Sequence, residues 1–142
     1  MVCNTIHLYY NKLQKEIQTP ILNLRKELEQ LLINKNIKST FTIGTPNTIK
    51  KGLYKFKGIK SFEPNKEEIK QLTNSIFNFN KGFDKELQIQ KVKKICKKYL
   101  KKGAEIVILG CTEFAVMLKE ENFPKINTID VLVEATIKKI IG

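Results

Sequence analysis

Residues 104–114 read AEIVILGCTEF, a mainly apolar run that is followed at once by a glycine, a cysteine and a threonine. The run has the length of a buried β-strand, so we expect a strand over residues 104–109 and a short helix over residues 111–119. A strand that is apolar on both faces is typical of a parallel sheet covered by helices. Cys111 would then lie at the carboxyl end of a strand, where open parallel sheets bind their ligands.

Candidate strands and helices alternate along the rest of the chain. A polar turn over residues 44–48 leads from one strand into a short helix that ends near Gly52. Strands that alternate with helices predict an α/β fold, in which a parallel sheet is flanked by helices. The remaining expected helices cover residues 8–18, 21–33, 66–79, 84–102 and 131–141, and the remaining strands cover residues 39–43, 58–62 and 126–129.

Length and composition predict one globular domain. The chain has 142 residues, of which 42% are hydrophobic and 28% charged, a balance that disordered chains lack. No apolar run reaches the ~20 residues that cross a bilayer, and the N-terminus does not resemble a signal peptide, so we expect a cytoplasmic protein without a membrane partner. Three cysteines and one histidine, without a paired-cysteine motif, favour reduced thiols and no metal site.

A net charge of +12 raises the question of a nucleic-acid partner. Much of this charge lies on the helix expected over residues 84–102. Val92, Ile95 and Tyr99 form an apolar stripe on that helix, so we interpret its lysines as the face exposed to solvent. Aromatic residues are not interleaved with the lysines, which argues against a nucleic-acid partner, although a polyanion site stays open. The lysines concerned are Lys91, Lys93, Lys94, Lys97, Lys98, Lys101 and Lys102.

A second cysteine, Cys3, lies in the segment VCNTIH over residues 2–7, and it also precedes a candidate helix. Racemisation needs a base on one face of a tetrahedral carbon and an acid on the other, and two thiols from separate turns could supply them. A helix N-terminus favours a thiolate and can hold a substrate carboxylate. Because no phosphate or pyridoxal signature is visible, Cys3 and Cys111 would act without a cofactor.

Each candidate residue also has a structural interpretation. Cys111 could be a small apolar residue at a strand end, and Cys96 lies on the apolar stripe of its helix, which favours a structural role. Glu113 could assist acid–base chemistry or interact with the helix dipole. His7 could orient Cys3 or the substrate, or it could lie at the surface or cap a helix. The threonines Thr45 and Thr48 could bind a carboxylate or cap the helix after Gly44, and Asn4, Thr5 and Thr112 add neutral donors.

At these residues the chain resembles the aspartate/glutamate racemase family, and in particular its aspartate branch. The segment CNTIH over residues 3–7 resembles the family's first cysteine motif, with the final histidine typical of the aspartate branch. GCTE over residues 110–113 resembles the second motif, in which the glutamate branch carries histidine in place of Glu113. The segment GTPNT over residues 44–48, followed by Tyr54, and Asp130 before the last helix also resemble family features.

The resemblance implies two similar α/β domains with an active site between them, and an amino-acid substrate. It assigns Cys3 and Cys111 as the catalytic acid–base pair. The chain departs from the family pattern in two ways. The family's glycine-rich region and most of its first sheet are not found ahead of Cys3, and Phe83 follows Gly82 where the family usually has a basic residue. The residues implied to lie near the substrate are Asn4, Thr5, Thr45, Thr48, Thr112 and Glu113.

These departures predict an incomplete first domain. We expect residues 1–35 to be a remnant of that domain, residues 36–128 a second α/β domain, and residues 129–142 a helix directed toward the first. The apolar faces over residues 8–32 and 131–141 would then lack a cover, which favours a homodimer.

Three functions follow from the sequence. The first is an aspartate or glutamate racemase, with activity in a chain of this length left open. The second is a related isomerase, such as a hydantoin racemase or a maleate isomerase. The third is a non-catalytic fragment or binding module with an acidic partner.

Overall fold

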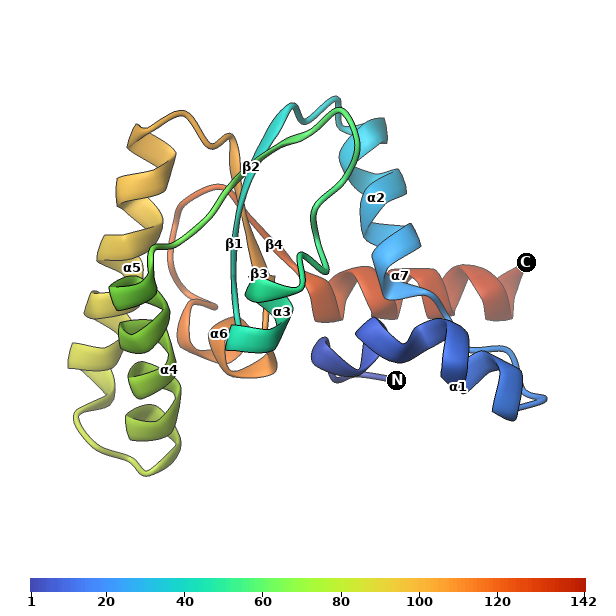
Figure 1. The fold of residues 1–142 in the computed structure, drawn as a ribbon, viewed down its shortest axis with the longest axis horizontal. Helices are drawn as coiled ribbons and strands as arrows, with labels where there is room; N and C mark the ends of the chain where they lie inside the picture. The colour runs from blue at the N-terminus through green and yellow to red at the C-terminus, as the bar shows by residue number, and fades with distance from the viewer.

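Four parallel strands form a single sheet in the order β2-β1-β3-β4 in the computed structural model, which describes residues 1–142 (Figure 1). Gly44 lies opposite Gly110 in the central pair, so the loops that follow these two strands start side by side. The expected α/β fold with a parallel sheet is confirmed. The strands are β1 (Ser39–Gly44), β2 (Lys60–Phe62), β3 (Ile106–Gly110) and β4 (Lys125–Asn127).

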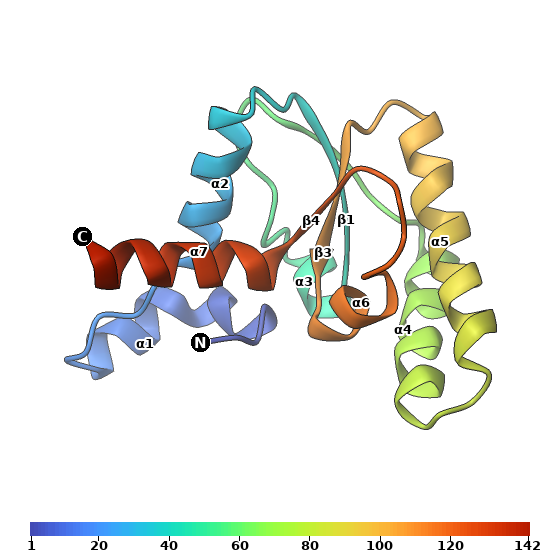
Figure 2. The same cartoon turned by 180° about the vertical axis from the view of Figure 1, so that it is seen from behind.

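Helices cover both faces of this sheet. Figures 1 and 2 show α4 and α5 along one side, and α2 and α7 on the other. No helix is both long enough and apolar enough to cross a membrane. The helices are η1 (Thr5–Tyr9), α1 (Tyr10–Glu16), α2 (Leu24–Asn34), α3 (Pro46–Lys50), α4 (Lys66–Asn80), α5 (Lys85–Lys101), α6 (Thr112–Met117) and α7 (Thr128–Ile141).

One hydrophobic cluster lies between the sheet and α5. Phe41 on β1 stacks on Tyr99 of α5 with 3.9 Å between ring centroids, and Val107 on β3 is fully buried in the same cluster. Cys96 belongs to this cluster, and burial raises the pKa of its thiol to about 12. Its position on the apolar stripe is therefore a packing position, as predicted.

A second cluster lies on the opposite face, and it corrects one expectation. Leu28 and Leu32 of α2 are completely buried, and they share this cluster with Ile108 of β3 and Val131 of α7. The expectation that the apolar face of the second helix has no cover is wrong, because α2 packs on the sheet itself. Single exposed apolar side chains remain on several helices, such as Ile33 on α2, Phe77 on α4 and Val116 on α6. The end of α7 exposes three of them close together, namely Ile137, Ile140 and Ile141.

Most element boundaries differ by a few residues from the expected ones, and two of the differences have a clear structural basis. The first expected helix is divided into η1 and α1, which ends at Glu16. β4 ends at Asn127, whose side chain caps α7 by accepting a hydrogen bond from the amide of Ile129 at 3.0 Å. The expected strand over residues 126–129 is therefore too long, since Thr128 already starts the helix and donates to the Leu109 carbonyl at 2.8 Å.

Candidate functional site

The two central strands end in glycines that let their following turns approach closely. A Cβ atom on Gly110 would lie 2.9 Å from the Ile43 carbonyl oxygen and 3.2 Å from the Tyr54 ring. A Cβ atom on Gly44 would lie 3.1 Å from the Gly110 carbonyl oxygen. Side chains at both positions would push the turns apart, so the glycines set the distance between Thr45 and Cys111.

Three threonine hydroxyls meet beside this edge of the sheet. The hydroxyl of Thr5 lies 2.8 Å from that of Thr45 and 3.1 Å from that of Thr48, and Thr45 donates to Thr48 at 3.1 Å. Thr45 also caps α3, because its hydroxyl accepts a hydrogen bond from the Thr48 amide. The capping interpretation is confirmed for Thr45. The structure also brings Thr5, from the N-terminal segment, to the turn after β1.

Tyr54 connects the two cysteine-bearing segments. Its hydroxyl donates to the Asn4 side-chain oxygen, and both side chains are buried. The Tyr54 ring also packs on Gly110, so it touches the residue after Cys3 and the residue before Cys111. Burial, together with the charge of Cys3, raises the pKa of Tyr54. Sequence reasoning noted this tyrosine six residues after Thr48 but did not place it among the site residues.

Cys111 is held as a neutral thiol. Its sulfur donates to Oε2 of Glu113 at 2.7 Å, and the Thr112 hydroxyl donates to the same oxygen at 2.9 Å. Burial, and then the hydrogen bond to Glu113, raise the pKa of Cys111 to about 12. The expectation that the N-terminus of the following helix favours a Cys111 thiolate is wrong, because burial and the neighbouring carboxylate outweigh the helix.

Glu113 itself is a carboxylate. Burial raises its pKa, but the donors around it outweigh burial, and the net result is a lowered pKa. Besides Cys111 and Thr112, the side-chain amide of Asn80 donates to Oε1 at 3.5 Å. The end of α4 therefore reaches the turn that carries Cys111.

Cys3 is exposed immediately before η1, and it lies within electrostatic range of both Tyr54 and Cys111. A negative charge on Cys3 adds to the rise in the pKa of Cys111. His7 fixes the segment that carries Cys3, since its Nε2 lies 3.0 Å from the Met1 carbonyl oxygen. Burial lowers the pKa of His7, and its buried position excludes the surface role considered from the sequence.

Other candidates lie apart from these contacts. Asp130 is exposed in the first turn of α7 and makes no hydrogen bond to the residues above. No three side chains of histidine, cysteine, aspartate or glutamate converge to hold a metal ion. The turn after β3 brings together the Cys111 thiol, the Glu113 carboxylate and the Thr112 hydroxyl, and Cys3 lies within electrostatic range of that thiol.

Comparison with known proteins gives a family match and several solved structures of similar fold. The sequence pattern of the Asp/Glu/hydantoin racemase family matches residues 1–136. A candidate Asp/Glu racemase from Yersinia pestis superposes with a TM-score of 0.84 at 19% identity, over 98% of this chain and 64% of that one. An aspartate racemase homologue from Pyrococcus horikoshii superposes with a TM-score of 0.79 at 23% identity, over 99% of this chain and 65% of that one.

A third solved structure, the aspartate racemase of Picrophilus torridus, gives a TM-score of 0.79 at 24% identity, over 98% of this chain and 60% of that one. At such identities the likeness shows a shared fold. The chain spans 60 to 65% of the length of these three structures.

Proposed function

Because the chain belongs to the Asp/Glu/hydantoin racemase family, as the match over residues 1–136 shows, we propose that it interconverts the L and D forms of aspartate, or of glutamate, without a cofactor. Cys3 and Cys111 are the proposed acid–base pair. One observation carries the proposal: Cys111 is held as a neutral thiol within electrostatic range of an exposed second thiol. A two-base racemase needs this unequal pair, one thiol and one thiolate.

The proposed reaction starts with Cys3 as thiolate. Cys3 removes the α-proton from one face of the substrate, and the electron pair of the broken C–H bond remains on the α-carbon. Cys111 donates its proton to the opposite face, so the configuration inverts and Cys111 becomes the thiolate. Glu113 opposes that charge, which favours return of a proton to Cys111. The kcat values of the two directions can therefore differ, whereas kcat/KM is the same in both because enantiomers have equal free energies.

The neutral donors are the proposed contacts for the substrate carboxylates. Thr5, Thr45 and Thr48 present three hydroxyls beside the turn after β1. The side-chain amide nitrogen of Asn4 is buried without a partner, so it has hydrogen-bonding capacity to offer. Thr112 completes the set beside Cys111. Aspartate is proposed ahead of glutamate because His7 and Glu113 match the aspartate branch in the two cysteine motifs.

A homodimer is proposed through the exposed apolar residues at the end of α7. Ile140 and Ile141 are 78% and 81% exposed, and Ile137 is 48% exposed. Covering such residues by a second copy removes apolar surface from water. Sedimentation velocity over a range of concentrations tests the proposal: the parent is expected to sediment as a dimer, and an Ile137→Lys/Ile140→Lys variant as a monomer. A parent that stays monomeric at all concentrations would contradict it.

The experiment that tests the function is ¹H NMR of substrate in deuterium oxide. Loss of the α-proton signal from L- or D-aspartate, abolished by Cys3→Ala and by Cys111→Ala but retained in Cys96→Ala, is the expected result. A parallel panel separates the aspartate racemase from the related isomerases: glutamate and a substituted hydantoin are followed by loss of the α-proton signal, and maleate by conversion of its vinylic signal to that of fumarate. Absence of exchange with every substrate would contradict catalysis by this chain.

A further inference from the structure

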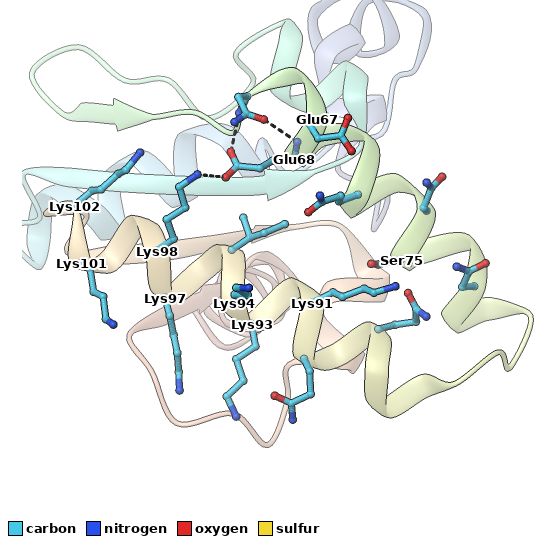
Figure 3. Close-up of a pocket in the computed structure, with 17 residues that line it drawn as sticks. Glu67, Glu68, Ser75, Lys91, Lys93, Lys94, Lys97, Lys98, Lys101 and Lys102 are labelled. Carbon is cyan, nitrogen blue, oxygen red and sulfur yellow. Dashed lines mark hydrogen bonds and ion pairs between the residues drawn. The ribbon is translucent and has the colours of Figure 1, made fainter.

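A groove of about 1150 Å³ lies between α4 and α5, and none of its lining residues belongs to either cysteine turn (Figure 3). Of the 17 lining residues only Ile95 is hydrophobic, and the others are lysines, amides, two glutamates and a serine. Lys91 extends from α5 toward Ser75 on α4. The groove is therefore built for a strongly polar ligand, in contrast to an apolar small-molecule pocket.

Most of the positive charge in the groove is not neutralised. Seven lysines line it, but only two are paired: Lys98 with Glu68, and Lys93 with Glu121 at 2.5 Å. The other five have no carboxylate within 4.0 Å. They are Lys91, Lys94, Lys97, Lys101 and Lys102.

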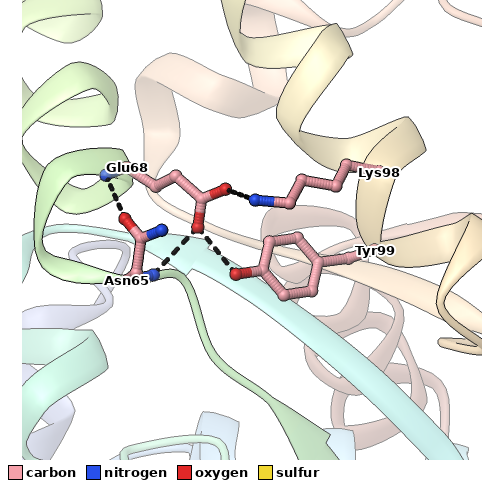
Figure 4. Close-up of polar contacts among 4 residues, drawn as sticks. All are labelled: Asn65, Glu68, Lys98 and Tyr99. Carbon is pink, nitrogen blue, oxygen red and sulfur yellow. Dashed lines mark hydrogen bonds and ion pairs between the residues drawn. The ribbon is translucent and has the colours of Figure 1, made fainter.

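The two helices that carry the groove are fixed to each other at one end. Glu68 of α4 accepts hydrogen bonds from the Asn65 amide at 2.9 Å and from the Tyr99 hydroxyl at 2.6 Å, and it pairs with Lys98 (Figure 4). Tyr99 and Lys98 belong to α5. The cluster therefore fixes the backbone of α5 against that of α4, so the spacing of the lysines along the groove is set before any ligand arrives.

We infer that this surface binds the phosphate backbone of a nucleic acid without reading its bases. Lysines three or four residues apart on a helix lie about 5 to 6 Å from each other, and the row from Lys91 to Lys102 extends roughly 16 Å, so several successive phosphates can be contacted. The amides of residues such as Gln71, Asn74 and Asn78 add uncharged donors to phosphate oxygens.

The composition of the groove argues for phosphates over bases or a protein partner. No exposed aromatic ring lines it, since Tyr99 is buried, so bases have no stacking platform. Protein interfaces have an apolar core depleted in lysine, whereas this groove has one apolar residue and seven lysines. The lysines of α5, which the sequence pattern predicted to be a solvated face, are thus proposed to contact the phosphates of a nucleic acid.

The test is fluorescence anisotropy with a labelled DNA duplex of mixed sequence, measured over a range of salt concentrations. Five lysine–phosphate contacts predict a slope of about −4 to −5 in a plot of log K against log salt concentration. The variant Lys91→Gln/Lys94→Gln/Lys101→Gln is expected to weaken binding at low salt at least about tenfold and to reduce the slope by about three. A second duplex of unrelated sequence is expected to bind equally well.

A matched control decides whether the groove or the net charge is responsible. Lys26→Gln/Lys35→Gln/Lys139→Gln removes the same charge from exposed positions outside the groove, and binding by this variant is expected to stay close to that of the parent. Equal losses in both triple variants would overturn the inference, as would a parent that does not bind at low salt. Displacement of the duplex by poly-glutamate as readily as by inorganic polyphosphate would also overturn it and would indicate an acidic protein partner.

Discussion

The hydroxyl of Tyr54 donates a hydrogen bond to the side-chain oxygen of Asn4, across 50 residues of sequence. The Tyr54 ring also packs on Gly110, so one side chain touches the neighbours of both proposed acid–base thiols. Because racemisation depends on the distance between Cys3 and Cys111, a residue that contacts both segments is expected to control that distance. Tyr54 is on this account a positioning residue.

Tyr54→Phe removes the hydroxyl and leaves the buried side chain of Asn4 without any partner, since its amide nitrogen already has none. We expect a loss of about 1 to 3 kcal/mol in the free energy of unfolding, measured by urea denaturation, and slower α-proton exchange. Tyr10→Phe is the matched control, because its hydroxyl bonds to the Ile21 carbonyl at 3.2 Å in a half-buried place. Equal effects of both substitutions on exchange would contradict the positioning role.

Thr48→Val keeps the shape of a buried side chain but removes one hydroxyl from the threonine cluster. If the cluster holds a substrate carboxylate, KM should rise about tenfold, the equivalent of one hydrogen bond. Thr136→Val is the control, since that hydroxyl bonds only to a carbonyl of its own helix. An unchanged KM in Thr48→Val would contradict binding of a substrate carboxylate by the threonine cluster.

Glu113→Gln removes the negative charge beside Cys111. The pKa of Cys111 is raised by burial and by Glu113, so the variant should have a lower pKa and more thiolate at pH 8. Alkylation of Cys111 by iodoacetamide should then accelerate about tenfold for each unit by which the pKa falls, as followed by mass spectrometry of the Cys111 peptide. Glu134→Gln, an exposed position on α7, should not change the rate. No acceleration in Glu113→Gln would mean that burial alone holds the thiol neutral.

Glu68→Gln tests the cluster that joins α4 to α5. The buried carboxylate has three donors, and its loss should lower the free energy of unfolding by about 1 to 3 kcal/mol at pH 7, whereas Glu67→Gln at the exposed neighbouring position should have little effect. Burial raises the pKa of Glu68, but its hydrogen-bond donors lower the pKa by more than burial raises it. The net result is a pKa below the ordinary value of 4.5.

The pH dependence of that difference follows from the lowered pKa. The stabilisation by the Glu68 carboxylate is fully present above the ordinary pKa of 4.5, and it is lost as pH falls through the lowered pKa of the folded state. The difference between the parent and Glu68→Gln should therefore shrink below pH 4.5. A difference that stays constant with pH would contradict the assigned charge state.

Most of the fold could be predicted because its signals are local. The apolar run of β3 and the stripe of Val92, Ile95 and Tyr99 on α5 have the periods of a buried strand and an amphipathic helix. The cover over α2 could not be predicted, since it depends on which face of the sheet Leu28 and Leu32 reach. The end of β4 was missed because Asn127 acts as a helix cap, which overrides the apolar pattern around it.

Candidate site residues could be proposed from the sequence, whereas their electrostatics could not. Cys3, Cys111 and the threonines were identified from motifs at the ends of strands and starts of helices. The raised pKa of Cys111 depends on burial and on the rotamer that places Glu113 against the sulfur, and neither is visible in a sequence. The contact of Tyr54 with Asn4 likewise requires the fold that brings the two segments together.

The most direct test of the account is solvent-deuterium exchange at the α-carbon of L- and D-aspartate, followed by NMR with the 142-residue chain. The account predicts exchange with both enantiomers at unequal rates, abolished when either Cys3 or Cys111 is replaced by alanine and retained in Cys96→Ala. Exchange that survives in Cys111→Ala, or a parent that shows none with either enantiomer, would contradict a two-thiol racemase site in this chain.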